Sequence, residues 1–352
     1  MFDKSTWIRL PRNVVVGHDV LGNVVNVIAD SHLSGRPHIV TSPTPRTIAA
    51  EPIRDSLEAD GLDPSITVIE TASFESVEVV LEDAKLADAG YLLGVGGGKA
   101  IDIAKMAADE LGVGFVSVPT AASHDGIVSG RGSVPDGDTR HSVSSEPPVG
   151  VVADTAIIAD APWELTTAGC ADIISNYTAV KDWRLANRLK NVSYSEYAAA
   201  LSQMTAEMLR DNAPSIKPGL EESAWIVVKA LVSSGVAMSI AGSSRPASGA
   251  EHLFSHQLDR IAPGRALHGH QVGVGSILTE YLHSGETGEW RGVRDALSSI
   301  DAPTDADSLG VGSDTVIEAL TTAHEIRDRY TILGDGISEA AAREAARRTG
   351  VI

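Results

Sequence analysis

Short apolar runs alternate with stretches of helical periodicity over roughly the first 160 residues of the chain. The apolar runs predict strands, at Asn13–Val16, Pro37–Thr41, Ile66–Ile69, Gly90–Val95 and Gly114–Pro119. The helical patterns between them include Thr47–Asp60, Glu75–Ala89 and Ala100–Leu111. This alternation predicts a parallel sheet with helices on both faces. The segment Ser129–Val149 breaks the pattern with glycines and a Pro147-Pro148 pair, and we interpret it as an irregular loop or a hairpin.

Beyond Pro162 the pattern is helical almost throughout. Long helices are predicted over Pro162–Leu189, Ser193–Asp211, Leu220–Ala241 and Ser248–Ile261, with three or more shorter ones after them. We therefore expect a Rossmann-like α/β domain over residues 1–160 and an all-helical domain over residues 161–352. The cleft between two such domains is a common place for an active site.

Acidic residues outnumber basic ones, with 47 Asp and Glu against 28 Lys and Arg and a net charge of −19. An acidic surface repels phosphate backbones, so we expect no nucleic-acid partner. The basic residues are 8 Lys and 20 Arg. Acidic excess with few lysines favours a halophilic protein from a cytosol rich in salt.

The chain has one cysteine, Cys170, which excludes an internal disulfide and a metal site built from several cysteines. A single thiol fits a reducing compartment, and we expect a cytoplasmic protein. The N-terminal residues MFDKSTWIRLPRNVVVG contain no apolar stretch like that of a signal peptide. No run approaches the ~18 uninterrupted apolar residues of a membrane helix, so we expect no membrane insertion.

A glycine-rich loop follows the fourth predicted strand and begins a helix. It contains Gly96, Gly97 and Gly98, followed by Lys99, Ala100, Ile101 and Asp102. Glycines let the backbone approach a ligand closely, and the N–H groups of the following helix favour a pyrophosphate. Because Lys99 is followed by Ala100, the loop is not a P-loop, and its spacing is not the ordinary dinucleotide fingerprint either.

A second loop, Thr120–Gly126, follows the fifth predicted strand at the same edge of the sheet, where open α/β sheets bind ligands. The hydroxyl groups suit a ribose or a nicotinamide amide, and Asp125 suits a substrate hydroxyl. After the second strand the residues Ser42–Arg46 supply hydroxyls and Arg46 but no carboxylate. Since a carboxylate there would reject a 2′-phosphate, the cofactor is expected to be NAD or NADP.

Histidines and a carboxylate in the helical half suggest a metal site. His252 and His256 lie four residues apart on one helix face, and His268 and His270 begin a later segment. Asp172 precedes Asn176 by one helical turn on an earlier helix. Ser248 and Glu251 have the spacing of a capping box, which would place His252 just past the first turn. Two histidines, one carboxylate and an open position are how proteins hold a catalytic Zn²⁺ or Fe²⁺; the spacing leaves open which of His268 and His270 takes part.

Taken together, these motifs resemble those of the sn-glycerol-1-phosphate dehydrogenases, members of the iron-containing alcohol dehydrogenase and dehydroquinate synthase superfamily. The resemblance extends over nearly the whole chain, and its motifs are Gly96–Asp102, Thr120–Gly126, Asp172–Tyr177, Ser248–His252 and His268-Gly269. It implies reduction of dihydroxyacetone phosphate to sn-glycerol 1-phosphate with NADH or NADPH, which supplies the glycerol backbone of archaeal membrane lipids. It also implies Zn²⁺, or Fe²⁺ or another divalent ion, at Asp172, His252 and His268, where His268 is chosen over His270 by its place before Gly269.

The resemblance and the loops together assign roles to further residues. We expect the first domain to bind the dinucleotide through both loops, and the second to bind the metal and the substrate. The predicted cofactor residues are Gly96, Gly97, Gly98, Lys99, Ala100, Ile101, Asp102, Thr120, Ala121, Ala122, Ser123 and Ser129. Asp125 and His256 are expected to hold the hydroxyl end of the substrate, and His256 to relay a proton through water, a role that is balanced against simple packing. Asn176 and Ser129, followed by Lys181, are candidates for the phosphate. Arg245 and Arg329 are further possibilities for it, although a place at the surface is preferred for both.

Three alternatives remain. A glycerol dehydrogenase of the same superfamily would lack phosphate recognition. A dehydroquinate synthase would need several cationic residues in the helical half, which has few lysines. A non-catalytic nucleotide-binding protein would keep only the glycine loop. The chain is expected to form a homo-oligomer, although the sequence does not give its order.

Overall fold

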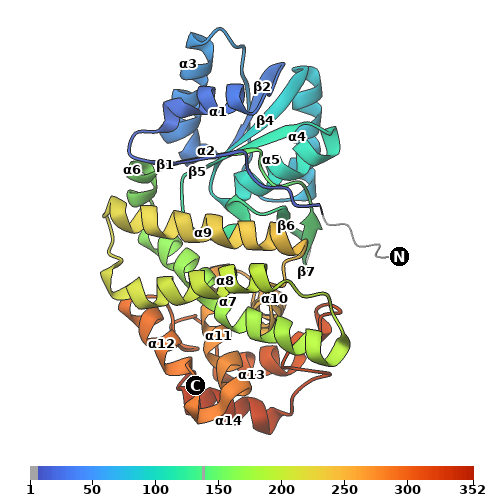
Figure 1. Cartoon of the computed structure of the whole chain (residues 1–352), viewed down its shortest axis with the longest axis vertical. Coiled ribbons are helices and arrows are strands. Elements are labelled where there is room, and N and C mark those ends of the chain that lie inside the picture. Colours follow the sequence, from blue (N-terminus) through green and yellow to red (C-terminus); the bar gives the residue numbers. More distant parts are fainter. Residues whose placement is uncertain (1–6, 137–138) are drawn as a thin grey trace.

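A six-stranded parallel sheet forms the core of the first half of the computed structural model, which describes residues 7–136 and 139–352 and the side chains outside 135–142 (Figure 1). The strand order is β1-β8-β5-β4-β2-β3. The strands are β1 Asn13–Gly17, β2 Arg36–Thr41, β3 Ser65–Val68, β4 Ala89–Gly96, β5 Gly114–Pro119 and β8 Gly150–Asp154. Five of these are the predicted strands. The sixth, β8, was not predicted, although all five of its residues are buried.

Helices cover both faces of this sheet, so its central strands are apolar on both sides. On one face, α1 and α3 pack on Leu93, Val116 and Val152. On the other face, α4 and α5 pack on Leu92 and Val151. The helical elements of this half are η1 Leu21–Asn23, α1 Val24–Asp30, α2 Pro43–Pro45, η2 Arg46–Ala50, α3 Glu51–Ala59, α4 Phe74–Leu86, α5 Gly98–Leu111, η3 Asp125–Ile127 and α6 Thr155–Ala159.

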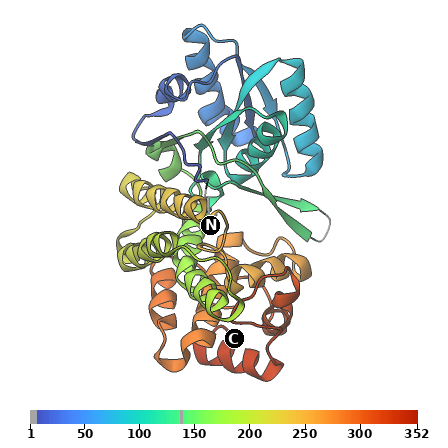
Figure 2. The same cartoon turned by 45° about the vertical axis from the view of Figure 1, so that its right-hand side comes forward.

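The segment predicted as a loop or hairpin contains an antiparallel hairpin of β6 Arg131–Asp136 and β7 Thr139–Ser144. Figure 2 shows it as an arm that extends away from the main sheet. One strand, β6, packs against α5, and the other, β7, packs against α10. The hairpin therefore connects the glycine-loop helix to a helix of the second half.

Every element from Trp163 onward is a helix in the part of the chain that the structure describes. These are α7 Trp163–Lys190, α8 Glu196–Asn212, η4 Ala213–Ser215, α9 Glu221–Ala241, α10 Ala250–Ile261, α11 His268–Ser284, η5 Gly285–Thr287, α12 Trp290–Ser299, α13 Ser313–Thr322, η6 Ala323–Glu325 and α14 Glu339–Thr349. The predicted fold class, a parallel α/β half followed by a helical half, is confirmed. We keep a domain boundary near Asp160 as a proposal, since the last strand ends at Asp154 and the long helices start at Trp163.

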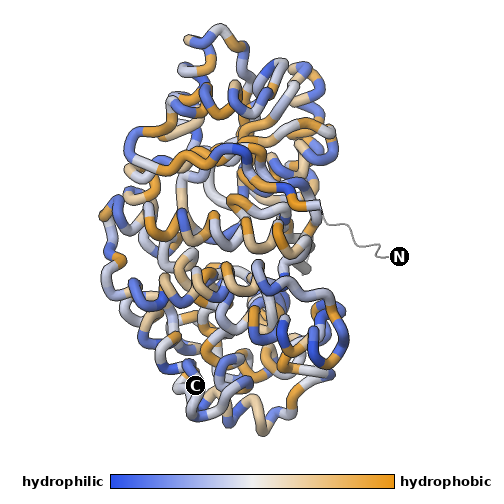
Figure 3. Tube along the Cα trace, in the orientation of Figure 1, coloured by the Kyte–Doolittle hydropathy of each residue, from blue (hydrophilic) through white to orange (hydrophobic). Residues whose placement is uncertain are grey.

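Helix α9 bears on the expectation that no segment crosses a membrane. It is long and apolar enough to cross a membrane by length and composition, with a mean hydropathy of 1.7 over an 18-residue window. In the fold it packs against α6, α7 and α8, and 44% of that window is buried (Figure 3). These contacts are those of a core helix. Residues 1–6, part of the stretch compared with signal peptides, lie outside the described residues.

Candidate active site

Three helices bring one carboxylate and two imidazoles together. Asp172 lies on α7, His252 on α10 and His268 at the start of α11. One potential ligand atom from each residue lies within 4.8 Å of those from the other two. Asp172 Oδ1 is 3.5 Å from His252 Nε2, and the His252 and His268 rings are 5.1 Å apart. A carboxylate and two imidazoles form a donor set that suits Zn²⁺ or Fe²⁺, so these residues fit the predicted metal.

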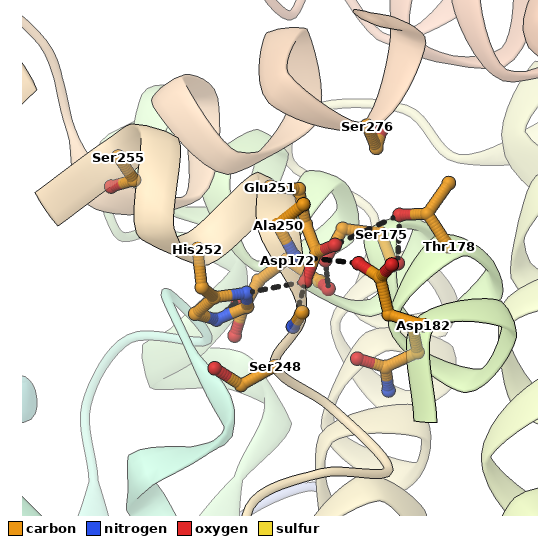
Figure 4. A network of polar contacts seen from close by, with 12 residues as sticks. Asp172, Ser175, Thr178, Asp182, Ser248, Ala250, Glu251, His252, Ser255 and Ser276 are labelled. Atoms are coloured by element: carbon orange, nitrogen blue, oxygen red, sulfur yellow. Dashed lines mark hydrogen bonds and ion pairs between the residues drawn. The ribbon is translucent and has the colours of Figure 1, made fainter. Parts of the chain in front are cut away.

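A buried glutamate orients His252. Glu251 is 0% exposed, and its Oε1 lies 3.0 Å from His252 Nδ1 (Figure 4). The same carboxylate accepts hydrogen bonds from the Gly249 amide and the Thr178 hydroxyl. Because an ionised carboxylate only accepts, Nδ1 carries a proton, so Nε2, which points toward Asp172, is the nitrogen that would bind a metal once it has lost its own proton.

The predicted capping box is therefore wrong. Helix α10 begins after Gly249, and no side chain caps it. Glu251 does reach back, but to the Gly249 amide, and the Ser248 hydroxyl accepts from Arg327 instead of the helix. His252 thus lies within the first turn of α10. Asp182, from α7, accepts from the Ala250 amide at 2.7 Å and holds that turn in place.

A second hydrogen-bond chain orients His268. Gln271 donates from Nε2 to Asp259, so its Oε1 is the acceptor for the Ser255 hydroxyl at 2.7 Å. The Ser255 oxygen is then the acceptor for His268 Nδ1 at 2.9 Å. The proton is on Nδ1, as in His252, and the lone pair on Nε2.

His270 and His256 have other surroundings. His270 Nε2 lies 2.8 Å from the Thr167 hydroxyl, burial lowers the pKa of its imidazole to about 4, and it is not part of the cluster of three. The structure thus places His268, and not His270, beside Asp172. His256 stacks on His268 at 5.6 Å and lines the same cavity.

Two glycines allow the elements of the site to approach closely. A Cβ on Gly169 of α7 would lie 1.9 Å from the Ala122 carbonyl oxygen, and one on Gly269 of α11 would lie 2.0 Å from that of Ala168. Helix α7 therefore packs its backbone directly on the predicted cofactor loop, and α11 packs on α7. This packing sets Asp172 against Asp125, whose amide donates to Asp172 Oδ2 at 3.1 Å.

Polar contacts link Asp125 to Asn176. Asp125 Oδ2 accepts from the Ser234 hydroxyl at 2.8 Å, and the Ser234 oxygen accepts from Asn176 Nδ2 at 3.0 Å. Burial and the charge of Asp172 raise the pKa of Asp125 to about 7. Burial lowers the pKa of His252, but its hydrogen bonds to Asp172 and Glu251 outweigh burial and raise it to about 9. The site thus favours positive charge among its carboxylates.

The predicted cofactor loops meet at the end of the sheet. Gly97 precedes α5, and the Thr120 amide donates to the Gly96 carbonyl at 3.0 Å. A Cβ on Gly98 would lie 1.9 Å from His124 Nε2, so the His124 ring covers this turn. Ala121, Ala122 and Ser129 are buried, and Ser123 is partly exposed.

The residues after the glycines differ in what they can offer a ligand. Lys99 is exposed and donates to the Glu70 carbonyl at 2.6 Å. Ala100 and Ile101 are fully buried, so they can serve a cofactor only through their backbone. Asp102 lines the cavity and accepts from Lys105, which is fully buried and also donates to the Gly126 and Arg131 carbonyls.

The expectations for phosphate-binding residues need correction. Lys181 is bound to both carboxylate oxygens of the fully buried Glu280 at 2.7 Å. Arg245 and Arg329 were expected at the surface, but both are partly buried, and Arg329 donates to the Ser244 hydroxyl at 2.9 Å. The roles of Glu251, Lys105, Ser234, Arg131 and Arg327 in the site were not predicted from the sequence. Only Lys105 could have been noticed, since it continues the helix face of Asp102.

The fold and the three-residue cluster define a class. Residues 15–162 match the family of iron-containing alcohol dehydrogenases. The solved structure of a probable glycerol dehydrogenase from Sinorhizobium meliloti superposes with a TM-score of 0.81 at 20% identity, and 98% of each chain is covered. An iron-containing alcohol dehydrogenase structure gives a TM-score of 0.74 at 17% identity, covering 99% of this chain and 100% of that one. At these identities the likeness concerns the fold alone.

The sequence relatives are more specific. The chain is 77% identical over 352 residues to glycerol-1-phosphate dehydrogenase (NAD(P)+) of Halobacterium salinarum, with 100% of both chains covered. It is 54% identical to the protein of the same name from Methanococcoides burtonii, over 100% of this chain and 98% of that one. The chain belongs to the glycerol-1-phosphate dehydrogenase family. The predicted family is confirmed, and relatives from halophilic archaea agree with the salt-adapted composition.

Proposed function

We propose that the chain is a metal-dependent oxidoreductase that reduces dihydroxyacetone phosphate to sn-glycerol 1-phosphate with NADH or NADPH. The observation that carries the proposal is the convergence of Asp172, His252 and His268 beside the loop of Asp125. The names of the relatives agree with this substrate and cofactor class. The product would supply the glycerophosphate backbone of archaeal lipids.

The side chains of the site would have different roles in the reaction. Asp172, His252 and His268 would hold a divalent ion, which when bound polarises a ketone oxygen while the nicotinamide supplies the hydride. Asp125, fixed by Ser234 and by its own amide, would hold the substrate's hydroxyl end. His256 would hold it from the other side and deliver a proton through water. Asn176 would act through Ser234, since its amide nitrogen donates to that hydroxyl.

The cofactor would lie along the end of the sheet. The turn Gly96–Gly98 and the first N–H groups of α5 would bind the pyrophosphate, with Lys99 at its edge. Thr120–Ser123 would bind the ribose and the nicotinamide amide, and Ser129 would bind near the ring. After β2, Arg46 pairs with Glu51 at 3.0 Å, so both a cation and a carboxylate are near the place of the ribose 2′-position. This agrees with use of both NAD and NADP.

We also propose a cytoplasmic homo-oligomer that is not inserted in a membrane. Its buried, free Cys170 agrees with a reducing compartment.

Three large side chains on one face of α8 are exposed, namely Tyr197 at 84%, Met204 at 51% and Met208 at 58%. Positions 197, 204 and 208 follow a helical repeat and form an apolar stripe that a second copy could cover. Light scattering of the wild type and of Met204→Glu in concentrated KCl tests this: a smaller mass for the variant supports it.

One assay separates the alternative functions. NADH and NADPH oxidation are followed with dihydroxyacetone phosphate and with dihydroxyacetone, and bound metal is determined by elemental analysis. Preference for the phosphorylated ketone supports the proposal, and preference for dihydroxyacetone supports a glycerol dehydrogenase. Cofactor binding without turnover and without metal supports a non-catalytic nucleotide-binding protein. Stereospecific analysis of the glycerol phosphate formed tests the sn-1 assignment.

A further inference from the structure

Four arginines lie in or beside the segment Ser244–Ser248, which leads into α10. They are Arg131, Arg245, Arg327 and Arg329. Within the described part of the chain, no carboxylate lies within 4.0 Å of any of the four guanidinium groups. Other arginines of the chain, such as Arg36, Arg210 and Arg343, do have acidic partners. Unpaired positive charge is concentrated at one place.

Hydrogen bonds to serines hold two of these guanidinium groups. Arg327 Nη2 donates to the Ser248 hydroxyl at 2.6 Å. Arg329 donates to the Ser248 carbonyl and, at 2.9 Å, to the Ser244 hydroxyl. Arg327 Nε is buried and has no acceptor among the described residues. A buried donor on a cation without an acceptor is costly, and an anionic ligand would relieve that cost.

The arginines also repel one another. Burial and the charges of Arg131 and Arg245 lower the pKa of Arg327 to about 10. Burial and the charges of Arg327 and Arg245 lower the pKa of Arg329 to about 9. Bringing a dianion among these groups would reverse this repulsion.

The cluster opens into the cavity of the three metal-site residues. Arg131, Arg327, Ser244 and Ser248 line the same cavity as Asp172 and His252. The lining of this cavity thus combines carboxylates and imidazoles with guanidinium and hydroxyl groups. A small ketone with an anionic group on its neighbouring carbon offers a partner to each kind of group.

We propose that Arg327 and Arg131, with the hydroxyls of Ser244 and Ser248, bind the phosphate of the substrate and set the preference for a phosphorylated ketone. This rests on the function proposed above. The planar guanidinium groups match phosphate oxygens with paired hydrogen bonds. Arg329 is a positioning residue, because it ties Ser244 to the backbone of Ser248. The two buried or partly buried lysines near the site already have partners. Lys105 donates to Asp102 and to backbone carbonyls, and Lys181 donates to Glu280.

The test compares Arg327→Gln and Arg131→Gln with the wild type as metal-loaded enzymes in concentrated KCl. The readout is the ratio of kcat/KM for dihydroxyacetone phosphate to kcat/KM for dihydroxyacetone. We expect this ratio to fall 30-fold or more in each variant, mainly through KM for the phosphorylated ketone. Arg327→Lys should recover part of it. The control Arg291→Gln removes an exposed arginine paired with Glu286 and should leave the ratio unchanged.

Binding of inorganic phosphate to the same proteins, by calorimetry, gives a readout that does not need turnover. The wild type should bind it, and both Gln variants should bind at least tenfold more weakly with unchanged metal content. An equal loss of kcat/KM for both ketones, without weaker phosphate binding, would overturn the proposal in favour of a structural role. A rise in KM for NADPH but not for NADH or dihydroxyacetone phosphate would overturn it in favour of the cofactor's 2′-phosphate. If the wild type reduces neither ketone but still binds phosphate in a way that depends on Arg327, the proposed enzymatic function is refuted while the anion-binding site is supported.

Discussion

Glu251 determines which nitrogen of His252 faces the site, because its Oε1 lies 3.0 Å from His252 Nδ1 and accepts that N–H. The other nitrogen is then directed at Asp172, 3.5 Å away. Glu251 is itself held by the Gly249 amide and by the Thr178 hydroxyl on α7. A buried carboxylate that does not reach the proposed metal thus controls the geometry of one of its ligands.

Glu251→Gln should weaken metal affinity by roughly 10-fold, and Glu251→Ala by up to about 100-fold, in line with the loss of other carboxylate partners of metal-binding histidines. Gln keeps the hydrogen bond to Nδ1 but removes the charge, whereas Ala also frees the ring to rotate. Competition with a chromophoric chelator measures the affinity. Glu222→Gln, at an exposed position on α9, is the matched control. Unchanged affinity in Glu251→Ala would show that the ring is oriented by packing alone.

His252→Ala should abolish metal binding and turnover while leaving NADH affinity largely intact, since the glycine loop lies on a different element. Asp172→Asn should behave similarly, because an amide oxygen is a weaker ligand than a carboxylate. Elemental analysis measures the metal, and the fluorescence of bound NADH measures the cofactor. Turnover by a metal-free variant would refute the assigned roles.

Gly169→Ala tests the contact between α7 and the loop of Ala122. Its Cβ would lie 1.9 Å from the Ala122 carbonyl oxygen, so α7 or the loop must move. Alanine favours a helix by up to about 1 kcal/mol over glycine, but overpacking of this kind costs typically 1–3 kcal/mol or more. We expect a net decrease in the free energy of unfolding, measured by urea denaturation, together with weaker NADH binding.

Gly22→Ala provides the comparison, because nothing lies within 4 Å of its added Cβ. It should change the free energy of unfolding by less than about 1 kcal/mol. Equal stability of the Gly169 and Gly22 variants would show that α7 and the Ala122 loop have room for an added methyl group.

The features predicted correctly from the sequence, the strands and the glycine turn, are those that short stretches of sequence determine. The apolar runs gave five strands of the sheet, and the turn of Gly96–Gly98 was recognised because three glycines before a helix have few other uses. Strand β8 was missed because it follows a hairpin and not a helix, so the alternation that identified the others is interrupted.

The capping box failed for a tertiary reason. The sequence cannot show that Arg327, 79 residues further on, takes the Ser248 hydroxyl. The same applies to the arginine cluster, whose members lie on β6, before α10 and after η6. Asp172, His252 and His268 were grouped by resemblance, and the hydrogen bonds that orient each ring could be seen only in the fold.

Cys170 should be unreactive toward thiol reagents in the native protein. It is fully buried on α7, and burial raises the pKa of its thiol to about 12, so almost no thiolate forms near neutral pH. Ellman's reagent should detect no thiol in the native state and one after denaturation. Glu222→Cys, with an exposed second cysteine, should give one native thiol and two denatured ones. Rapid native labelling of the wild type would mean that α7 opens locally.

His38 should make the protein less stable in mild acid. It is 1% exposed between the Ser65 and Thr67 hydroxyls, and burial lowers the pKa of its imidazole, with a smaller opposing effect of Asp83. Because the unfolded chain takes up the proton near pH 6.5 and the native state resists it, the unfolded state binds more protons below that pH. The contribution of His38 is therefore fully present above about pH 6.5 and is lost as the pH falls toward its native pKa.

Urea unfolding of the wild type and His38→Gln, at pH 7.5 and pH 5.5 in the same salt, checks this. Between these values the wild type should lose up to about 1 kcal/mol more than the variant, since one pKa unit corresponds to about 1.4 kcal/mol. His32→Gln, which removes an exposed histidine, should follow the wild type. A His38→Gln variant with the same loss as the wild type would assign the acid sensitivity to other groups, because glutamine can still bind both hydroxyls but cannot titrate.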